Sequence, residues 1–585
     1  MRPPSIQYFY LEKPTVLLIV ITLLSVFLWI GRGDFYTKGE PREASVAVSM
    51  VEKNQWILPE VYADEIAYKP PLMHWLTAVF SLPEGKVTPL SSRLPSAMAF
   101  LGLIVCSFMF FGRNLRMQEA FLVALILLTV FETHRSAMSA RVDMLLTFLI
   151  VLALTLLFRW EEEKKLTGFP WLIPIVMSLA VLTKGPVGIV LPLLIFGIYL
   201  LFLRYNVWKI TYKLFILALP ALILPSIWYF LAFQKGGKEF LDLILAENFG
   251  RFWDTGNLNV PYDLGHKGDW WYNLTSLAGG FIPWTFLLVI SLFGLSYNRF
   301  PSIKKMWSGF IQMEKIKLFS VLAAIIVILF YSIPISKRSV YLMPAYPFIA
   351  IFLAQYILYL TEYKVKISRI FAVFIGIIAC FVSLIVFLTV TTNWINPANF
   401  TINIAKNAGW AIHFSEIWQY AHFSNSDFII SVVLLIILIF AIYQLFKSFR
   451  KKLYLKTLYA IFGVYLILLL AMDSLFFPAY KDAISNKPAA FRLESRYNFT
   501  DNNLFVVNNL LEYSNMYGLN FYLHNSFRNF EIESPVEGYF LTGVNSFKKV
   551  FQKYETSYQF DFLEEFPNYT RDGEPIIQLY FFKKK

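Results

Sequence analysis

The sequence predicts an all-α polytopic membrane protein that ends in a small α/β domain. Among its 585 residues, 57% are hydrophobic and 16% are charged, whereas about a quarter of the residues in a soluble globular protein are charged. About thirteen apolar runs are long enough to cross the roughly 30 Å hydrocarbon layer as helices. After the last run, short β-rich segments alternate with polar helical stretches, which is typical of a small soluble domain.

The composition also argues against several classes of protein. A net charge of +13 could indicate a nucleic-acid partner, but basic residues of a membrane protein collect in its cytoplasmic loops, so no nucleic acid is expected. The two cysteines, Cys106 and Cys380, each lie inside an apolar run. Neither a disulfide framework nor a cysteine metal site is therefore predicted.

The predicted spans follow one another along the first four fifths of the chain. They lie near residues 14–31, 93–112, 118–133, 143–158, 170–183, 187–203, 214–233, 275–296, 318–334, 339–360, 370–392, 428–446 and 457–476. Arg2 and Lys13 precede the first run and no cleavage site of small residues follows it, which favours a retained anchor over a signal peptide.

A single topology places most of the basic loops on one side. If the first span starts in the cytoplasm, the cytoplasmic loops carry Arg113, Arg116, Arg159, Lys164, Lys165, Arg204, Lys209, Lys304, Lys305, Lys364, Arg369, Lys447, Arg450, Lys451 and Lys452. This repeated agreement with the positive-inside rule supports that orientation. With an odd number of spans, the chain from about residue 478 onward lies outside.

We therefore predict two domains, a membrane domain over 1–476 and an extracytoplasmic α/β domain over 477–585. Three long loops face outside, over 32–92, 234–274 and 393–427, and long loops of a compact protein are often functional. In the tail we expect strands at Leu504–Val507, Phe521–Leu523, Tyr539–Leu541 and Ile576–Phe582. The sequence has no internal repeat, which weighs against transporters built from duplicated halves.

Charged residues mark the first outer loop as a candidate site. Glu40 and Arg42 lie two residues apart, and could serve as a base and as a bidentate phosphate ligand; the alternative is an ordinary charge cluster at a helix N-terminus. Lys69 precedes Pro70 and Pro71, which fix it ahead of a helix N-terminus where an anion is favoured. A lysine that snorkels to the membrane interface is the alternative.

Further candidates lie at the outer ends of later spans. Asp143, next to Arg141, begins the fourth predicted span, where an ionisable residue is either a site or half of a structural ion pair. Lys184 lies in the short turn between the fifth and sixth spans, and snorkelling would also explain it. The remaining candidates are Arg251 and His266 in the second long loop and Lys337, Arg338 and Tyr341 between the ninth and tenth spans. A lone histidine such as His266 is more often a hydrogen-bonded surface group than a ligand.

The basic candidates share one feature, since all of them are predicted to lie on the side that the positive-inside rule disfavours for cations. They are Arg42, Lys69, Lys184, Arg251, Lys337 and Arg338. Cations gathered there indicate an anionic ligand. Together with the acids Glu40 and Asp143 and nearby aromatic groups, they fit a lipid-linked phosphate that carries a sugar.

The order and spacing of these segments resemble the bacterial lipid-linked-sugar glycosyltransferases of the GT-C class, especially the aminoarabinose transferases that act on lipid A, and more widely the protein O-mannosyltransferases. The matching segments are Gly39-Glu40-Pro41-Arg42-Glu43-Ala44, Trp56-Ile57-Leu58-Pro59, Lys69-Pro70-Pro71-Leu72, Arg93-Leu94-Pro95-Ser96, Arg141-Val142-Asp143, Leu182-Thr183-Lys184-Gly185-Pro186, Glu247-Asn248, Arg251-Phe252, His266, Trp271-Tyr272, Pro283-Trp284, Ser336-Lys337, Tyr341-Leu342 and Pro344.

The resemblance implies a GT-C fold in a bacterial inner membrane, with its active site on the extracytoplasmic face. The donor would be a sugar on polyprenyl phosphate, and the acceptor would be a lipid, a glycan or a protein. Membrane lipid would surround the protein. The implied roles are catalysis by Glu40 and Asp143, and phosphate binding by Arg42, Lys69, Lys184, Arg251, Lys337 and Tyr341. A flippase of lipid-linked sugars and an oligosaccharide ligase or polymerase are the alternative functions.

Two positions depart from the family pattern. Members commonly carry an Asp-Glu pair before the arginine, but here Gly39 precedes Glu40. In the aminoarabinose branch, a glutamate before the Lys-Pro contributes to a zinc site with the histidine of the second loop, but Tyr68 occupies that position here. A divalent metal is therefore expected at most at a partial site that includes His266, and no cofactor is predicted with it.

Overall fold

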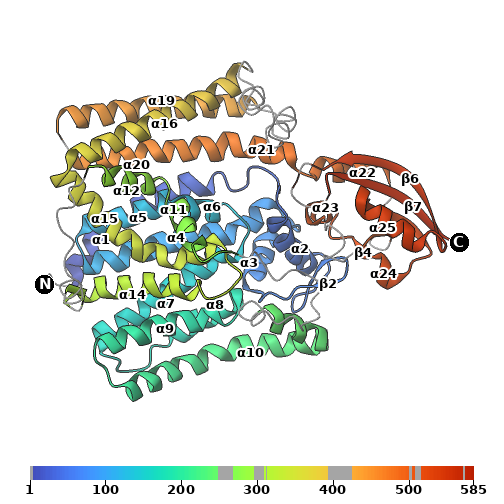
Figure 1. The fold of residues 1–585 in the computed structure, drawn as a ribbon, viewed down its shortest axis with the longest axis horizontal. Coiled ribbons are helices and arrows are strands. Elements are labelled where there is room, and N and C mark those ends of the chain that lie inside the picture. Colours follow the sequence, from blue (N-terminus) through green and yellow to red (C-terminus); the bar gives the residue numbers. More distant parts are fainter. Residues whose placement is uncertain are drawn as a thin grey trace.

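The computed structural model describes residues 4–247, 268–294, 309–310, 312–392, 424–452 and 454–497, and in the tail residues 499, 503–507, 516–568, 570 and 574–585. Figure 1 shows a bundle of roughly parallel helices with a small sheet domain attached at one end, while the N-terminus lies at the other end. Two short helices, α2 (Gly39–Val51) and α3 (Leu72–Ser81), lie between the bundle and the sheet domain.

Each predicted apolar run coincides with a helix or a helix pair. The bundle elements are α1 (Pro4–Thr22) with η1 (Leu23–Phe27), α4 (Pro89–Asn114), α5 (Met117–Thr129), α6 (Phe131–Ala137), α7 (Val142–Lys164), α8 (Leu172–Lys184), α9 (Val187–Phe202), α10 (Val207–Leu245), α11 (Tyr272–Gly280), α12 (Trp284–Leu292), α14 (Lys315–Phe330), η4 (Ser339–Ala345), α15 (Tyr346–Tyr363), α16 (Val365–Thr392), α19 (Asn425–Arg450), α20 (Tyr454–Ala471), η5 (Met472–Phe476) and α21 (Phe477–Ile484). The last three of these elements, α20, η5 and α21, follow one another without a break and pass residue 476. The domain boundary at residue 476 therefore remains a prediction.

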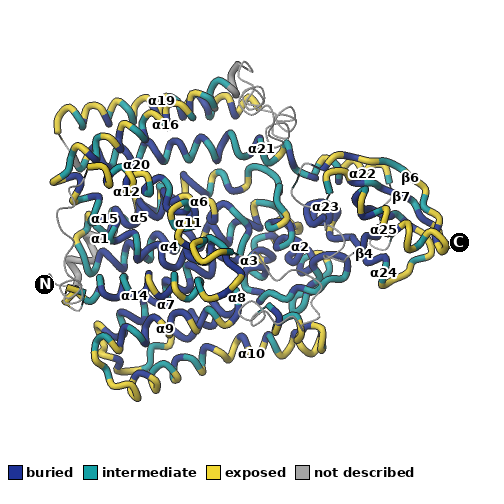
Figure 2. Tube along the Cα trace, in the orientation of Figure 1, coloured by how far each residue is buried: buried dark blue, intermediate teal, exposed yellow. Residues whose placement is uncertain are grey.

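Within the described residues, seven helices are long and apolar enough to cross a membrane alone, and up to nine spans result if each of two bent pairs counts as one. Shorter apolar helices, α8 and α9 among them, accompany these spans. The bundle interior, around α4, α5 and α7, is buried, whereas α10, α16 and α19 at its edges are largely exposed (Figure 2). Their exposed side chains are apolar, for example Ile223, Phe230, Ile377 and Phe440. Such faces require lipid, and the chain is a multi-pass integral membrane protein.

Two predicted spans are bent. The run 275–296 is not one straight helix, because α11 and α12 meet at 106°. Pro283 lies at the break, where it lacks an N–H and disfavours helical geometry in the residue before it. The run 118–133 is also not one straight helix. Within it, α5 ends at Thr129, Val130 is extended, and α6 continues at an angle of 64° to α5.

The tail contains a five-stranded sheet with the order β4-β3-β5-β7-β6, in which β3 pairs in parallel with β4 and β5 and the other pairs are antiparallel. Its elements are α22 (Lys487–Arg496), β3 (Leu504–Val506), α23 (Tyr517–Tyr522), β4 (Arg528–Asn529), α24 (Phe530–Glu533), β5 (Glu537–Gly543), α25 (Val544–Tyr554), β6 (Tyr558–Pro567) and β7 (Ile576–Lys584). The strand predicted at Phe521–Leu523 is wrong, because α23 occupies most of it. A short apolar run fits a buried helix and a strand equally well.

The tail packs against the segment between the first two spans, residues 32–88, which we call the loop-one unit. This unit contains α2, β1 (Glu60–Tyr62), β2 (Glu65–Ile66), α3 and η2 (Leu82–Glu84). Phe35, Val46 and Tyr62 share one hydrophobic core with Leu519 and Phe527 of the tail. The loop-one unit is therefore held by the bundle on one side and by the tail on the other.

Hydrogen bonds reinforce this contact. Asn520 of α23 donates to the Val61 carbonyl at 3.2 Å and to the side chain of Asn525, and it accepts from the Phe527 amide at 3.3 Å. Asn525 in turn donates to Ser49 Oγ of α2 at 2.7 Å. Asn520 is fully buried, so its side-chain amide depends on these protein groups for its hydrogen bonds.

We expect Asn520→Ala to loosen the tail from the loop-one unit. The substitution leaves buried polar groups unpaired, which costs about 1–3 kcal/mol. The thermal unfolding midpoint in detergent should fall, and protease should release the tail sooner. Asn545→Ala in the same domain is the matched control, because Asn545 is exposed. Equal behaviour of the two variants would contradict the proposed docking contact.

Candidate active site

The start of α2 is fixed by a buried ion pair. Arg93 of α4 donates from Nε to Glu40 Oε1 at 2.8 Å and from Nη2 to Glu40 Oε2 at 3.3 Å. The Ala140 amide donates to Glu40 Oε1 at 3.0 Å. Burial alone would raise the pKa of Glu40, but the charge and hydrogen bonds of Arg93 outweigh it and hold that pKa below its usual value. The Glu40 carboxylate thus joins the loop-one unit to the bundle.

Arg93 also binds the chain that leads into this unit. Its Nη1 donates to the carbonyls of Ile30 at 3.0 Å and Gly33 at 2.9 Å, and the whole side chain is buried. Both carboxylate oxygens of Glu40 are engaged in these contacts, and Glu40 is not among the residues that line the neighbouring cavity. The structure gives Glu40 an anchoring position, and its role as catalytic acid stays a prediction.

A small cavity lies beside α2. The residues that line it all belong to the loop-one unit, and they are Arg42, Glu43, Val46, Val61, Glu65, Ala67, Tyr68, Lys69 and His74. It thus contains two of the predicted phosphate ligands, Arg42 and Lys69. It also contains acids that the sequence analysis did not select.

Glu43 is the central acid of this cavity. Lys69 Nζ donates to its Oε1, Arg42 Nη2 lies 3.4 Å from the same oxygen, and His74 Nε2 lies 2.9 Å from Oε2. Burial would raise the pKa of Glu43, but Lys69, His74 and Arg42 together hold it well below its usual range. Glu43 is therefore a carboxylate at neutral pH, and it faces the two cations.

Lys69 is a buried cation next to another cation. Burial and the charge of Arg42 lower its pKa to about 8, although Glu43 acts in the opposite direction. Its place is set by local sequence, because Pro70 and Pro71 keep it in the loop just ahead of α3. Across the cavity, burial raises the pKa of Glu65, which accepts a hydrogen bond from Tyr517 of the tail at 3.3 Å.

A second charged group adjoins the cavity. Lys184, at the end of α8, donates to Asp143 Oδ1 at 2.5 Å, and its Nζ lies 4.0 Å from the centre of the Tyr341 ring. The positive charges of Arg141 and Lys69 are both close enough to act electrostatically on Asp143. Lys69 therefore links Arg42 and Glu43 on one side with Asp143 and Lys184 on the other.

The other predicted residues have different surroundings. Lys337 is buried and donates to the Gly268 carbonyl at 2.9 Å, so it fixes the chain just ahead of α11. Arg251 and His266 lie outside the described residues. The structure therefore brings together Arg42, Lys69, Asp143, Lys184 and Tyr341, while Glu40 anchors the unit beside them.

Glu43 and His74 are the site residues that the sequence analysis missed. The sequence contained a signal for Glu43. The family pattern has a carboxylate at position 39, and Glu43 follows Gly39 by about one helical turn, so it lies on the same face of α2. Which of the two acids, Glu40 or Glu43, meets Arg93 depends on tertiary packing. The structure also explains Gly39: a Cβ there would lie 2.5 Å from Arg141 Nη2, so the Arg141 guanidinium occupies the space of a side chain.

The residues present do not fit the zinc site that the family resemblance suggested. Tyr68 occupies the position of the expected carboxylate and lines the cavity. Within the described part of the chain, no three histidine, cysteine or acidic side chains gather in a way that could hold a metal ion. We derive no chemical step through a metal.

Comparisons with known proteins agree with this fold. A family model described as dolichyl-phosphate-mannose-protein mannosyltransferase matches residues 68–229. The crystal structure of ArnT from Cupriavidus metallidurans bound to undecaprenyl phosphate matches with a TM-score of 0.65 and 17% identity, over 97% of each chain. At this identity the likeness concerns the fold alone, and it confirms the predicted helical membrane fold with a small C-terminal sheet domain.

Two curated relatives match part of the chain. An uncharacterized protein of Aquifex aeolicus is 28% identical over 358 residues, which cover 60% of this chain and 66% of the relative. The undecaprenyl phosphate-alpha-4-amino-4-deoxy-L-arabinose arabinosyl transferase of Shewanella sediminis is 26% identical over 357 residues, which cover 60% of this chain and 61% of the relative. The chain thus spans less than two thirds of the length of either relative.

We expect Arg93→Ala to destabilise the protein strongly. Removing one partner leaves the Glu40 charge buried and unpaired, which typically costs about 3–5 kcal/mol. The measurement is the fraction of monodisperse protein that survives a heating series in detergent. Arg159→Ala is the matched control, since Arg159 forms an exposed pair with Glu163, and such pairs contribute about 0–1 kcal/mol. A similar loss in both variants would refute the anchoring role.

Proposed function

We propose that the chain is an integral-membrane glycosyltransferase. It would move a sugar from a polyprenyl-phosphate carrier to a hydroxyl or phosphate group of a lipid, glycan or protein. The observation that carries this proposal is the cavity in which Arg42 and Lys69 face the Glu43 carboxylate, with Lys69 within electrostatic range of Asp143, the partner of Lys184. Cations suited to a phosphate thus adjoin carboxylates suited to accept a proton.

The proposed location is a bacterial inner membrane, with the site and the tail on the extracytoplasmic face. The basic loops support this orientation, because Arg113, Lys164, Arg204, Lys364 and Lys451 all belong to connections at the end of the bundle away from the tail. The loop-one unit lies at the opposite end. A carrier lipid could present its phosphate there without leaving the bilayer.

The proposed reaction is a displacement at the anomeric carbon. The acceptor oxygen forms a bond to that carbon while the bond from the carbon to the phosphate oxygen breaks, and polyprenyl phosphate leaves with one additional negative charge. The acceptor proton passes to a carboxylate, for which we propose Glu43, with Asp143 orienting the acceptor. Arg42, Lys69 and Lys184 stabilise the charge on the leaving phosphate.

The remaining candidates complete the proposal. Tyr341 lies against Lys184 and would position its ammonium group. Arg251 and Lys337 are further proposed phosphate ligands, and Glu40 holds α2 in place beneath the cavity. Glu40 was the catalytic acid expected from the sequence, so substitutions of Glu40 and Glu43 are compared in the test below.

We expect Glu43→Gln to reduce sugar transfer by at least about 100-fold, the usual contribution of a positioned base. The assay incubates purified protein in lipid nanodiscs with radiolabelled undecaprenyl-phosphate sugars and a membrane extract, and asks which lipid, glycan or protein fraction acquires label. Glu40→Gln should instead lower the yield of folded protein, with transfer per folded molecule closer to wild type.

The opposite pattern would assign the base to Glu40. If wild-type protein transfers no sugar from any monophosphate donor, the proposal fails. Movement of the donor across the bilayer without transfer would then indicate a flippase, and transfer from a diphosphate-linked oligosaccharide would indicate a ligase or polymerase.

A pH dependence follows from Lys69. Its pKa of about 8 means that it is charged below pH 8 and loses its charge above. The affinity for undecaprenyl phosphate should therefore be constant from about pH 7, where the phosphate is already ionised, and fall above pH 8. Binding is measured by native mass spectrometry of protein in nanodiscs across this range.

Lys69→Arg is the control for this dependence, because an arginine stays protonated throughout. Its binding should not change between pH 7 and pH 9, whereas Lys69→Ala should bind weakly at every pH. A wild-type affinity that stays constant through pH 8 would remove Lys69 from the proposed phosphate site.

A further inference from the structure

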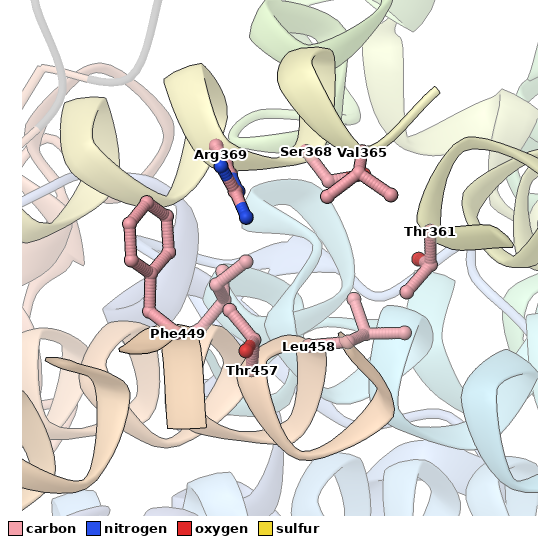
Figure 3. Close-up of a pocket in the computed structure, with 8 residues that line it drawn as sticks. Thr361, Val365, Ser368, Arg369, Phe449, Thr457 and Leu458 are labelled. Atoms are coloured by element: carbon pink, nitrogen blue, oxygen red, sulfur yellow. The ribbon is translucent and has the colours of Figure 1, made fainter. Parts of the chain in front are cut away.

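A second cavity lies at the opposite end of the bundle from the candidate active site. It is a small pocket that is partly open to its surroundings. It lies where α15 gives way to α16 and α19 gives way to α20 (Figure 3). The residues that line it are Thr361, Val365, Ser368, Arg369, Phe449, Thr457, Leu458 and Ile461.

Arg369 is the charged group of this cavity. Figure 3 shows its side chain directed from α16 toward the helices that carry Phe449 and Thr457. Its guanidinium carbon lies 4.6 Å from the centre of the Phe449 ring. None of the ion pairs formed between described residues includes Arg369.

Three side chains with hydroxyl groups, Thr361, Ser368 and Thr457, also line the cavity, and Thr361 and Thr457 are buried. Hydroxyl and guanidinium donors together suit the oxygen atoms of a phosphate group. The other lining residues include the apolar side chains of Val365, Leu458 and Ile461.

The surrounding sequence is strongly basic. Between 361 and 369 and between 447 and 457 the only acid is Glu362, and the bases are Lys364, Lys366, Arg369, Lys447, Arg450, Lys451, Lys452 and Lys456. The positive-inside rule assigns such a segment to the cytoplasmic face. The anionic lipids of that leaflet are attracted by juxtamembrane cations.

The cavity also adjoins the lipid-facing surface. Ile370 and Val373 of α16 and Tyr443 and Phe446 of α19 are exposed apolar or aromatic side chains within about two helical turns of it. Acyl chains could lie along these helices while the head group occupies the cavity. A soluble anion would gain nothing from this apolar surface.

We propose that this cavity binds the head group of one anionic phospholipid from the cytoplasmic leaflet. Arg369 contacts the phosphodiester, the hydroxyl groups of Thr457 and Ser368 donate to it, and the acyl chains lie against α16 and α19. The site is separate from the cavity beside α2, and the proposal does not depend on glycosyl transfer.

The test is native mass spectrometry of the full-length protein released from nanodiscs of phosphatidylglycerol and phosphatidylcholine with identical acyl chains. Wild-type protein should retain one phosphatidylglycerol in preference to phosphatidylcholine. Arg369→Ala should lose this preference by roughly fivefold or more, the effect of one cation at the membrane surface. Arg369→Lys keeps the charge and should retain a measurable preference.

Lys366→Ala is the charge-matched control, because Lys366 is exposed and does not line the cavity. If it reduces retention as much as Arg369→Ala, the basic surface acts without a defined site and the proposal is overturned. Equal retention of both lipids by wild type has the same consequence. Displacement of the lipid by millimolar glycerol phosphate would overturn it too, because it would identify a site for soluble phosphates.

Discussion

The buried contact between Arg93 and Glu40 is the constraint on which the site depends. A charged pair without access to water is stable only when its geometry satisfies both partners, and here one guanidinium serves a carboxylate and the carbonyls that precede α2. The contact therefore fixes both the position and the rotation of α2. Arg42 and Glu43 follow within one turn, so their direction into the cavity is a consequence of the same pair.

From this anchor the charges form a continuous series. Glu43 and Arg42 interact with Lys69, and Lys69 acts on Asp143, which is paired with Lys184. Three cations in the series, Arg42, Lys69 and Lys184, share two acids, Glu43 and Asp143, so one positive charge is left without an acid of its own in the series. A phosphate that binds here must compete with the carboxylates for the cations. Binding of the phosphate would therefore release a carboxylate that can accept a proton.

Much of this fold could be predicted because lipid imposes a simple rule on sequence. Every apolar run became a helix, since a backbone in hydrocarbon must satisfy its own hydrogen bonds. The rule says nothing about straightness, which explains the missed bends at Val130 and Pro283. In the tail, where water is the solvent, the short apolar run around Phe521 was assigned to the wrong type of element.

The candidate site was predictable only in part. The predicted orientation, which places basic residues on the side that disfavours them, identified Lys69 and Lys184 from sequence. The roles of Glu40 and Glu43 could not be separated, because they depend on Arg93, more than fifty residues further along the chain. The glycine at position 39 could not be explained from sequence either, because the space that a side chain would need there is occupied by the distant Arg141 guanidinium.

The core shared by the loop-one unit and the tail has a consequence for biosynthesis. Phe35 and Tyr62 are made well before Leu519 and Leu579, which complete their packing. During translation the early half of this core waits for the bundle that lies between them to be inserted. The loop-one unit, which forms the walls of the candidate cavity, therefore reaches its final packing only after the tail has been made.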